Sequence, residues 1–173
     1  AVKRGADEID IVLNRSAFLA GDEQRAFEEI VASKDACGEA HLKVILEVGE
    51  LGSYDKIRQA SMLAMTAGAD FIKTSTGKIS QASSLPRVLC MAEAVRDFAY
   101  QTDISVGIKA AGGIRTAKQA WHYLVVIGET LGTKWLNPEM FRIGASGLLN
   151  DVLLQLNRLD SGSYSGPDYV TVD

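Results

Sequence analysis

The sequence predicts an α/β fold of the TIM (β/α)8 barrel type, in which parallel strands alternate with helices. Five short apolar runs recur along the chain, with helical patterns between them. Runs this apolar, without strict alternation, are typical of strands that are covered on both faces. The distance from one run to the next is that of one βα unit. Polar residues near the ends of these runs are the third observation that favours a barrel.

The predicted elements follow one another in a regular order. Strands are expected at 9–13, 43–48, 71–75, 106–110 and 141–145. Helices are expected at 23–36, 54–67, 85–100 and 116–131, with a last helix after Gly147 and a first helix already in progress at 1–5. This order leaves two architectures, a doubly wound open sheet and a (β/α)8 barrel.

Polar residues near the carboxyl ends of the predicted strands separate these two architectures. Helices cover both faces of an open sheet, so charged side chains stay out of the middle of its strands. A barrel opens at its C-terminal face, where side chains from several strands share one pocket. The barrel is therefore the favoured interpretation. The residues concerned are Asp10, Glu47, Lys73 and Lys109.

The length of the chain covers only part of such a barrel. A complete barrel needs eight units and about 250 residues, whereas these 173 residues hold five. We therefore expect the chain to be the C-terminal five βα units of a longer protein. The partial barrel domain is expected at 1–159, followed by a flexible Gly- and Ser-rich tail at 160–173.

Composition excludes several classes of function. A net charge of −4 and a pI near 5.2 argue against nucleic acid as a partner. No apolar stretch approaches the roughly 20 residues that span a bilayer, and no export leader is visible, so no membrane partner is expected. Cys37 and Cys90 are isolated, which is typical of reduced thiols in the cytoplasm. His41 and His122 lack the spacing of a metal site.

Two lysines, Lys73 and Lys109, stand near the ends of neighbouring predicted strands. Adjacent strands lie about 4.8 Å apart, so two amines that point into one pocket repel each other's charge. Such repulsion lowers the pKa of an amine and prepares it to attack a carbonyl and form a Schiff base. The alternative is that these lysines bind a substrate phosphate or pair with Asp10 and Glu47.

An internal repeat places a carboxylate opposite Lys73. The segments GADEID (5–10) and GADFIK (68–73) align without a gap, so that Asp10 corresponds to Lys73. In a barrel the inward side chains of alternate strands share a layer. Asp10 and Lys73 are therefore expected to face one another, although GAD is also a common loop sequence in which Gly ends a helix.

Glycines precede the last two predicted helices. Gly112 and Gly113 stand before one, and Gly144, Ser146 and Gly147 before the other. Glycines there let backbone N–H groups approach a ligand, and the N-terminus of a helix favours an anion. These loops predict a phosphate site; the alternative is ordinary turn and cap glycines. Neither a P-loop nor a dinucleotide fingerprint is present.

Five segments together resemble the 2-deoxyribose-5-phosphate aldolase family of class I, Schiff-base aldolases. The resemblance covers residues 3–157. It implies a (β/α)8 barrel, no metal or other cofactor, and reversible cleavage of 2-deoxy-D-ribose 5-phosphate to D-glyceraldehyde 3-phosphate and acetaldehyde. The segments are GADEIDIVLNR (5–15), KVILEVGEL (43–51), GADFIKTSTGK (68–78), VGIKAAGGIRT (106–116) and FRIGAS (141–146).

The resemblance also implies roles for individual residues. Lys73 matches the lysine that forms the Schiff base, and Lys109 the second lysine, which is expected to stay cationic and keep Lys73 uncharged. Asp10 matches the aspartate of the proton relay. The implied phosphate contacts are Gly77, Lys78, Gly112, Gly113, Gly144 and Ser146.

Some positions depart from the family pattern. Gly147 stands where many members carry a second hydroxyl residue, and Val48 where threonine is usual. Tyr164 and Tyr169 in the tail do not match well enough to be assigned to the site. Two alternatives stay open: a Schiff-base aldolase for a different sugar phosphate, and a non-catalytic sugar-phosphate-binding protein. Barrel aldolases often form homodimers, but nothing in the sequence establishes one here.

Overall fold

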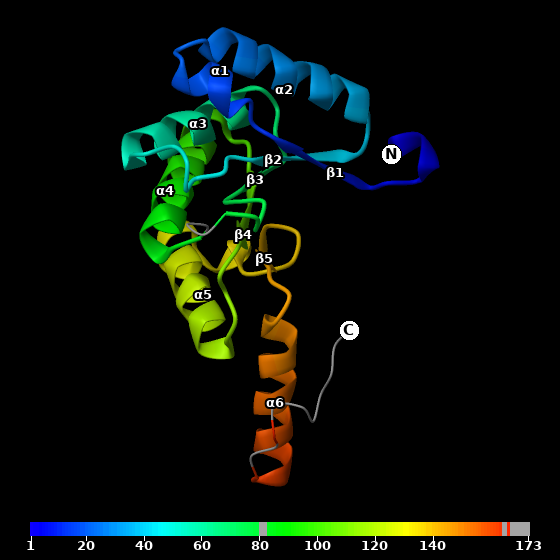
Figure 1. Cartoon of the computed structure of the whole chain (residues 1–173), viewed down its shortest axis with the longest axis vertical. Helices are drawn as coiled ribbons and strands as arrows, with labels where there is room; N and C mark the ends of the chain where they lie inside the picture. Colours follow the sequence, from blue (N-terminus) through cyan, green and yellow to red (C-terminus); the bar gives the residue numbers. More distant parts are fainter. Residues whose placement is uncertain (80–82, 164–165, 167–173) are drawn as a thin grey trace.

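Five parallel strands form one sheet in the order β1-β2-β3-β4-β5, with helices in the connections (Figure 1). The computed structural model describes residues 1–79, 83–163 and 166. Each predicted strand is present, so the sheet has the order of a partial (β/α)8 barrel. The strands are Glu8–Val12 (β1), His41–Ile45 (β2), Phe71–Lys73 (β3), Gly107–Ala111 (β4) and Phe141–Gly144 (β5).

The long helices confirm the predicted segments to within two residues at each end. A short additional helix precedes α2, and the first residues form a 3-10 turn at Val2–Arg4 instead of the expected end of a helix. The helices are Arg15–Leu19 (α1), Glu23–Cys37 (α2), Tyr54–Thr66 (α3), Leu85–Thr102 (α4), Ala117–Leu131 (α5) and Leu148–Ser161 (α6), and a second 3-10 turn spans Thr133–Trp135.

Capping side chains fix where three of the longer helices begin. Asp22 accepts a hydrogen bond from the backbone N–H at the start of α2, and Ser53 does the same for α3. At α5 the cap is reciprocal, because Thr116 accepts from the Gln119 N–H while the Gln119 side chain accepts from the Thr116 N–H. Each cap satisfies N–H groups that have no partner inside the helix.

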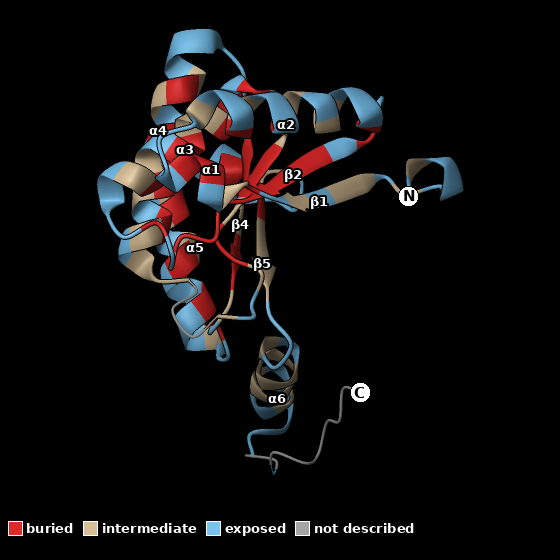
Figure 2. Cartoon of the chain, turned by 45° about the horizontal axis from the view of Figure 1, so that its top comes forward, coloured by how far each residue is buried: buried red, intermediate tan, exposed pale blue. Residues whose placement is uncertain are grey.

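The two faces of the sheet differ, contrary to the predicted absence of alternation. One face packs apolar side chains against the helices, as the buried strand and helix surfaces of Figure 2 show. The opposite face, which would line the inside of a barrel, carries at least one charged side chain from each of the five strands. The helix-facing residues include Leu42, Val44, Ile72 and Ile108, and the charged ones are Glu8, Asp10, Lys43, Lys73, Lys109 and Arg142.

A buried aromatic ring lies beneath the charged residues, at the start of β3. Phe71 packs against Gly107, where an added Cβ would stand 2.2 Å from the ring. The ring lies 4.7 Å from the Arg142 guanidinium and 5.5 Å from the Lys43 amine, both measured to its centroid. Glycine at position 107 therefore makes room for a ring that two cations contact through its π face.

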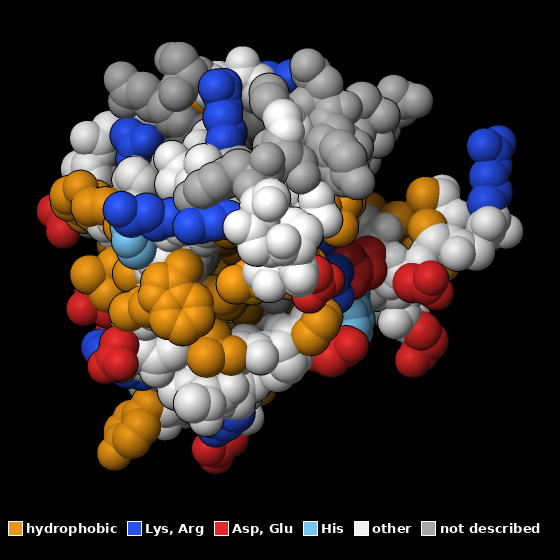
Figure 3. All heavy atoms as spheres, turned by 90° about the horizontal axis from the view of Figure 1, so that it is seen from below, with side chains coloured by type: hydrophobic (Ala, Val, Ile, Leu, Met, Phe, Trp, Pro, Cys, Tyr) orange, Lys and Arg blue, Asp and Glu red, His pale blue; other side chains and the backbone are white. Residues whose placement is uncertain are grey.

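Helix α6 contacts α5 but otherwise projects away from the rest of the helices (Figure 1). It has no buried residue, and Leu149, Leu156 and Leu159 are exposed. Seen from below, the surface shows hydrophobic side chains gathered among charged ones (Figure 3). A hydrogen bond of 2.6 Å from the Ala117 N–H to the Asp151 carboxylate connects α6 to the start of α5.

The predicted tail falls largely outside the described residues. Helix α6 continues two residues past the predicted boundary at 159 and ends at Ser161, with Gly162 as its C-cap. Tyr164 and Tyr169 lie outside the described residues. None of the helices in the described part of the chain combines the length and hydrophobicity that a bilayer crossing needs.

Candidate active site

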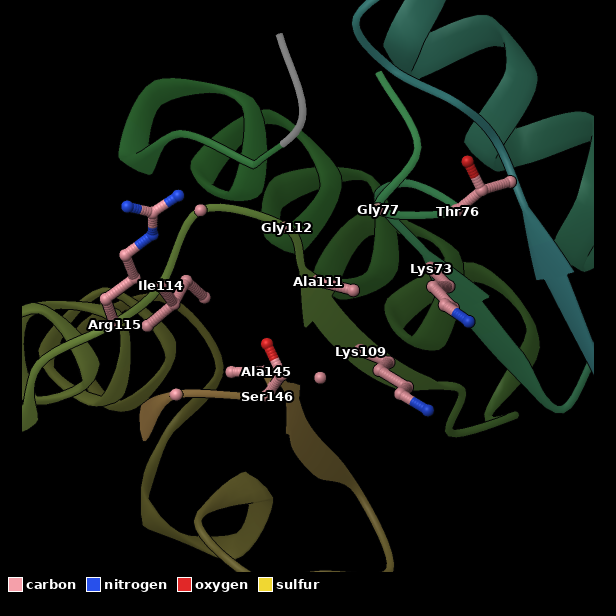
Figure 4. A pocket seen from close by; sticks show the side chains of 13 residues that line it. Lys73, Thr76, Gly77, Lys109, Ala111, Gly112, Ile114, Arg115, Ala145 and Ser146 are labelled. Carbon is pink, nitrogen blue, oxygen red and sulfur yellow. The ribbon is translucent and has the colours of Figure 1, made fainter. Parts of the chain in front are cut away.

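A pocket of about 540 Å³ opens at the carboxyl ends of β3, β4 and β5 (Figure 4). The three strands and the loops that follow them supply its walls. Most of the residues predicted for the site meet here. The lining residues are Lys73, Thr76, Gly77, Lys109, Ala111, Gly112, Gly113, Ile114, Arg115, Gly144, Ala145, Ser146 and Gly147.

Asp10 and Lys73 are in direct contact, as the internal repeat predicts. The Lys73 amine donates to Asp10 Oδ2 at 2.7 Å, although the two residues belong to β1 and β3. Strands in a barrel are tilted and staggered, so side chains two strands apart can meet across the interior. Asp10 is therefore the carboxylate that reaches the pocket amine, even though it does not line the pocket wall itself.

The other oxygen of Asp10 is held by a lysine that the sequence interpretation did not select. The Lys43 amine donates to Asp10 Oδ1 at 3.0 Å and to Glu8 Oε2 at 2.7 Å. Only 2% of Lys43 is exposed. Arg142 donates to the same Glu8 oxygen at 2.5 Å, so a chain of ion pairs runs from β5 to β3 through β1 and β2.

These contacts keep both carboxylates ionised at neutral pH. Partial burial acts to raise the pKa of Asp10, but the hydrogen bonds from Lys73 and Lys43 outweigh it and leave the pKa below its usual range. The hydrogen bond from Arg142, together with Lys43 and against some burial, lowers the pKa of Glu8 to about 2. The Asp10 carboxylate is thus a fixed negative charge between two amines.

Lys109 is the register partner of Lys73 on β4, and Figure 4 shows both amines extending to the same side of the sheet. Burial is the main cause that lowers the pKa of Lys109, and the charges of Lys73, Lys43 and Arg142 lower it further. The predicted like-charge repulsion is therefore present. Its effect falls on Lys109, the lysine expected from the sequence to stay cationic.

The lowered pKa of Lys109 implies a cost to folding that a neutral side chain removes. The charged form is disfavoured in the folded state, so the cost is largest at low pH, shrinks once the pH passes the lowered pKa of Lys109 in the folded protein, and is gone above the ordinary value of 10.5. We expect Lys109→Met to raise the Tm by a few degrees at pH 7, with a smaller gain at pH 10. Thermal unfolding of this variant, beside Lys118→Met at an exposed position of α5, tests this; an equal gain at both pH values would contradict it.

Glycines shape the two loops that close the pocket opposite the lysines. Gly112 and Gly113 adopt φ of 99° and 82°, a region that side chains rarely enter. Gly144 approaches β4 so closely that an added Cβ would lie 3.0 Å from the Lys109 side chain. Together with Ser146 at the start of α6, these loops provide the backbone surface expected for a phosphate.

Lys78 is the predicted phosphate contact that the structure does not bring to the pocket wall. It is exposed, and its backbone N–H donates to Thr76 Oγ1 at 3.2 Å. The segment 80–82, which follows shortly after, is outside the described residues. Conversely, Arg115 lines the pocket although the sequence does not single it out.

Two further groups of side chains differ from what the sequence predicts. Glu47, a candidate partner for the lysines, instead accepts a hydrogen bond from Thr76 Oγ1 at 2.6 Å. The charged network also contains Lys43, Glu8 and Arg142. In the sequence, only the alternation of charged and apolar residues along the strands indicates that these side chains belong to it. Over the described residues, no group of three or more His, Cys, Asp or Glu side chains is arranged to hold a metal ion.

Comparison with known proteins places this geometry in a family. The profile of the DeoC/LacD family aldolases matches residues 1–151. The deoxyribose-phosphate aldolases of Homo sapiens and Bos taurus are 49% and 50% identical over 165 residues, which are 95% of this chain and 52% of theirs. The chain therefore spans about half the length of the curated relatives it matches.

Solved structures agree in fold. A putative deoxyribose-phosphate aldolase from Toxoplasma gondii has a TM-score of 0.79 at 27% identity, over 94% of this chain and 63% of its own. One from Coccidioides immitis has a TM-score of 0.73 at 32% identity, over 89% of this chain and 55% of its own. The five strands thus correspond to part of a larger barrel in each of these relatives.

Proposed function

Because the chain belongs to the DeoC/LacD family of aldolases, we propose that its protein cleaves 2-deoxy-D-ribose 5-phosphate reversibly to D-glyceraldehyde 3-phosphate and acetaldehyde. The relatives named deoxyribose-phosphate aldolase support this substrate. The observation that carries the proposal is the Lys73 amine in the pocket, 2.7 Å from Asp10 and in register with Lys109.

In the proposed reaction, Lys73 Nζ attacks the aldehyde carbon of the open-chain sugar. The amine must be uncharged to do so. Loss of water from the carbinolamine then gives an iminium, which draws electrons from the bond to be broken. The proposed role of Lys109 is electrostatic.

Asp10 is the proposed proton relay. Its carboxylate, through a water, accepts the proton of the substrate hydroxyl whose deprotonation breaks the carbon–carbon bond. The electron pair of that bond moves into the iminium and leaves an enamine on Lys73, while D-glyceraldehyde 3-phosphate departs. Protonation of the enamine carbon and hydrolysis of the resulting iminium release acetaldehyde and restore the amine.

The glycine loops are the proposed phosphate site. Backbone N–H groups and the start of α6 suit a dianion, and Arg115 adds a positive charge to the pocket wall. Lys78 remains a proposed contact whose long side chain would reach the phosphate from outside the wall. The full set is Gly77, Lys78, Gly112, Gly113, Gly144 and Ser146.

An assay of products tests the proposal. The protein that carries this chain is expected to convert 2-deoxy-D-ribose 5-phosphate to acetaldehyde and D-glyceraldehyde 3-phosphate in equal amounts, with no loss of rate in a metal chelator. Cleavage of a different sugar phosphate instead would favour another Schiff-base aldolase. Binding of the sugar phosphate without cleavage would favour a binding protein.

Compartment and assembly are part of the same proposal. A cytoplasmic location is supported by two free cysteines, Cys37 and Cys90, which suit a reducing compartment. Self-association into a homodimer is supported by hydrophobic side chains exposed on the helices, Trp121 and Val125 on α5 among them. The proposed barrel domain ends near residue 159, and the tail follows it.

A further inference from the structure

Glu47 combines two features that are each unfavourable. It follows β2 with a backbone φ of 54°, in the left-handed region that non-glycine residues seldom occupy. Its carboxylate is also buried, since only 1% of the residue is exposed, and a buried charge is costly unless it is hydrogen-bonded. Strain of this kind persists only where surrounding contacts hold it in place, and such positions cluster at functional sites.

The contacts that hold Glu47 come from the loop after β3. The Thr76 N–H lies 3.2 and 3.3 Å from the two carboxylate oxygens of Glu47, and Thr76 Oγ1 donates to Oε2 at 2.6 Å. Arg15 stands farther off, 3.8 Å from Oε2, and pairs at 2.6 Å with exposed Glu50. Thr76 is therefore the main partner of the Glu47 carboxylate.

Thr76 in turn belongs to the wall of the pocket. Thr76 and Gly77 both line it, and Figure 4 shows the Thr76 side chain directed away from the amines of Lys73 and Lys109. Thr76 Oγ1 also accepts the N–H of Lys78 at 3.2 Å. The Thr76 side chain, which is hydrogen-bonded to Glu47, thus lies on the outer side of the loop, while the loop backbone faces the pocket.

The opposite side of this loop is fixed to β4. The hydroxyls of Thr74 and Ser75 both donate to the carbonyl of Ala111, at 2.8 and 2.7 Å. The Gly77 N–H lies 3.3 Å from Ser75 Oγ. With Glu47 on one side and Ala111 on the other, the backbone at positions 76 and 77 is held from two neighbouring strands.

We propose that Glu47 and Thr76 form a clamp that positions Gly77 of the pocket wall, and with it the adjoining Lys78, for the phosphate of the substrate. The inference rests on the proposed function, which assigns phosphate contact to these two residues. Glu47 touches no reacting atom, so it is a positioning residue. Its role is to set the preference of the site for a phosphorylated sugar over the same sugar without phosphate.

Thr76→Val tests the clamp with little change in shape, because valine lacks only the hydroxyl that donates to Glu47. Glu47→Gln is the reciprocal change, which replaces one accepting oxygen with an amide N–H₂. Each variant is expected to raise the KM for 2-deoxy-D-ribose 5-phosphate about tenfold, as expected for loss of a hydrogen bond to a charged group. The kcat/KM for unphosphorylated 2-deoxy-D-ribose is expected to change less than twofold.

Three further variants separate the clamp from a general contribution to stability. Thr76→Ser restores the hydroxyl and should return the KM close to that of the unmodified protein. The double variant should be no worse than either single one, because both remove the same interaction. Glu50→Gln changes another carboxylate in the loop of Glu47, one that pairs with Arg15 at 2.6 Å; it is the matched control and should leave the KM unchanged.

Equal losses of kcat/KM for the phosphorylated and the unphosphorylated sugar, or an unchanged KM in folded Thr76→Val, would contradict the proposed clamp. If the unmodified protein cleaves neither sugar, the proposed function fails and the clamp is judged by binding alone. The Kd of D-glyceraldehyde 3-phosphate, measured by titration calorimetry, should then rise about tenfold in Thr76→Val. The same Kd in both proteins would reject it.

Discussion

Replacing Lys73 with methionine is expected to lower kcat for 2-deoxy-D-ribose 5-phosphate cleavage by about 10⁴-fold or more, which is the scale of losing the nucleophile of a covalent mechanism. Methionine has a similar length and fits the half-buried position at the end of β3. It lacks the amine, so no iminium can form. The measurement is the rate of acetaldehyde formation under saturating substrate.

Lys78→Met is the matched control for this change. It removes an amine of the same type five residues further along, from an exposed position outside the pocket wall. We expect this variant to raise KM through the phosphate while retaining kcat within about tenfold. Near-normal turnover in Lys73→Met, or a complete loss of turnover in Lys78→Met, would show that Lys73 is not the lysine that forms the Schiff base.

The second large effect is expected for Asp10→Asn, which should lower kcat by about 10²- to 10⁴-fold, the usual range for a general acid–base group. Asparagine keeps the shape but has one accepting oxygen, whereas Asp10 accepts from Lys73 at one oxygen and from Lys43 at the other. The amide N–H₂ would face an ammonium group. The negative charge that keeps both amines in place would also be gone.

Steady-state kinetics across pH, together with the Tm of each protein, distinguish a role of Asp10 in proton transfer from a purely structural role. Asp97→Asn is the control, since Asp97 is also an ion-paired carboxylate but binds Arg58 and Arg96 on the helices, away from the pocket. It should leave kcat unchanged. If Asp10→Asn folds, binds substrate and turns over normally, Asp10 has no part in proton transfer.

The order of the strands and helices, and the contact of Asp10 with Lys73 in the site, could be predicted from the sequence. Apolar runs spaced one βα unit apart give the strands directly, because a parallel sheet needs a covered connection between each pair. The aligned segments GADEID and GADFIK give the contact of Asp10 with Lys73, since equivalent positions in alternate barrel strands meet inside.

The remaining members of the charged network could not be found in this way. Lys43 and Arg142 lie inside predicted strands that were interpreted as covered on both faces. Their direction follows only from the register, in which Asp10 pairs with Lys43 and Lys109 with Arg142. With the register known, the alternation of charged and apolar residues identifies the inner face of the sheet.

Glu47 shows why partners across loops escape a sequence interpretation. It was assigned to the end of a strand, but β2 stops at Ile45 and Glu47 turns into a left-handed conformation. Its partner Thr76 belongs to a different loop, 29 residues further along the chain. No local pattern links two such positions, because the link depends on how neighbouring strands end at the same edge of the sheet.

A covalent bond between the protein and a two-carbon aldehyde tests the account most directly. The protein is treated with acetaldehyde and borohydride, which reduces an iminium to a stable secondary amine, and its intact mass and peptides are measured. One ethyl group on the peptide that contains Lys73, and none in Lys73→Met, is the predicted result. A protein that stays unmodified, or carries the ethyl group on another lysine, would contradict it.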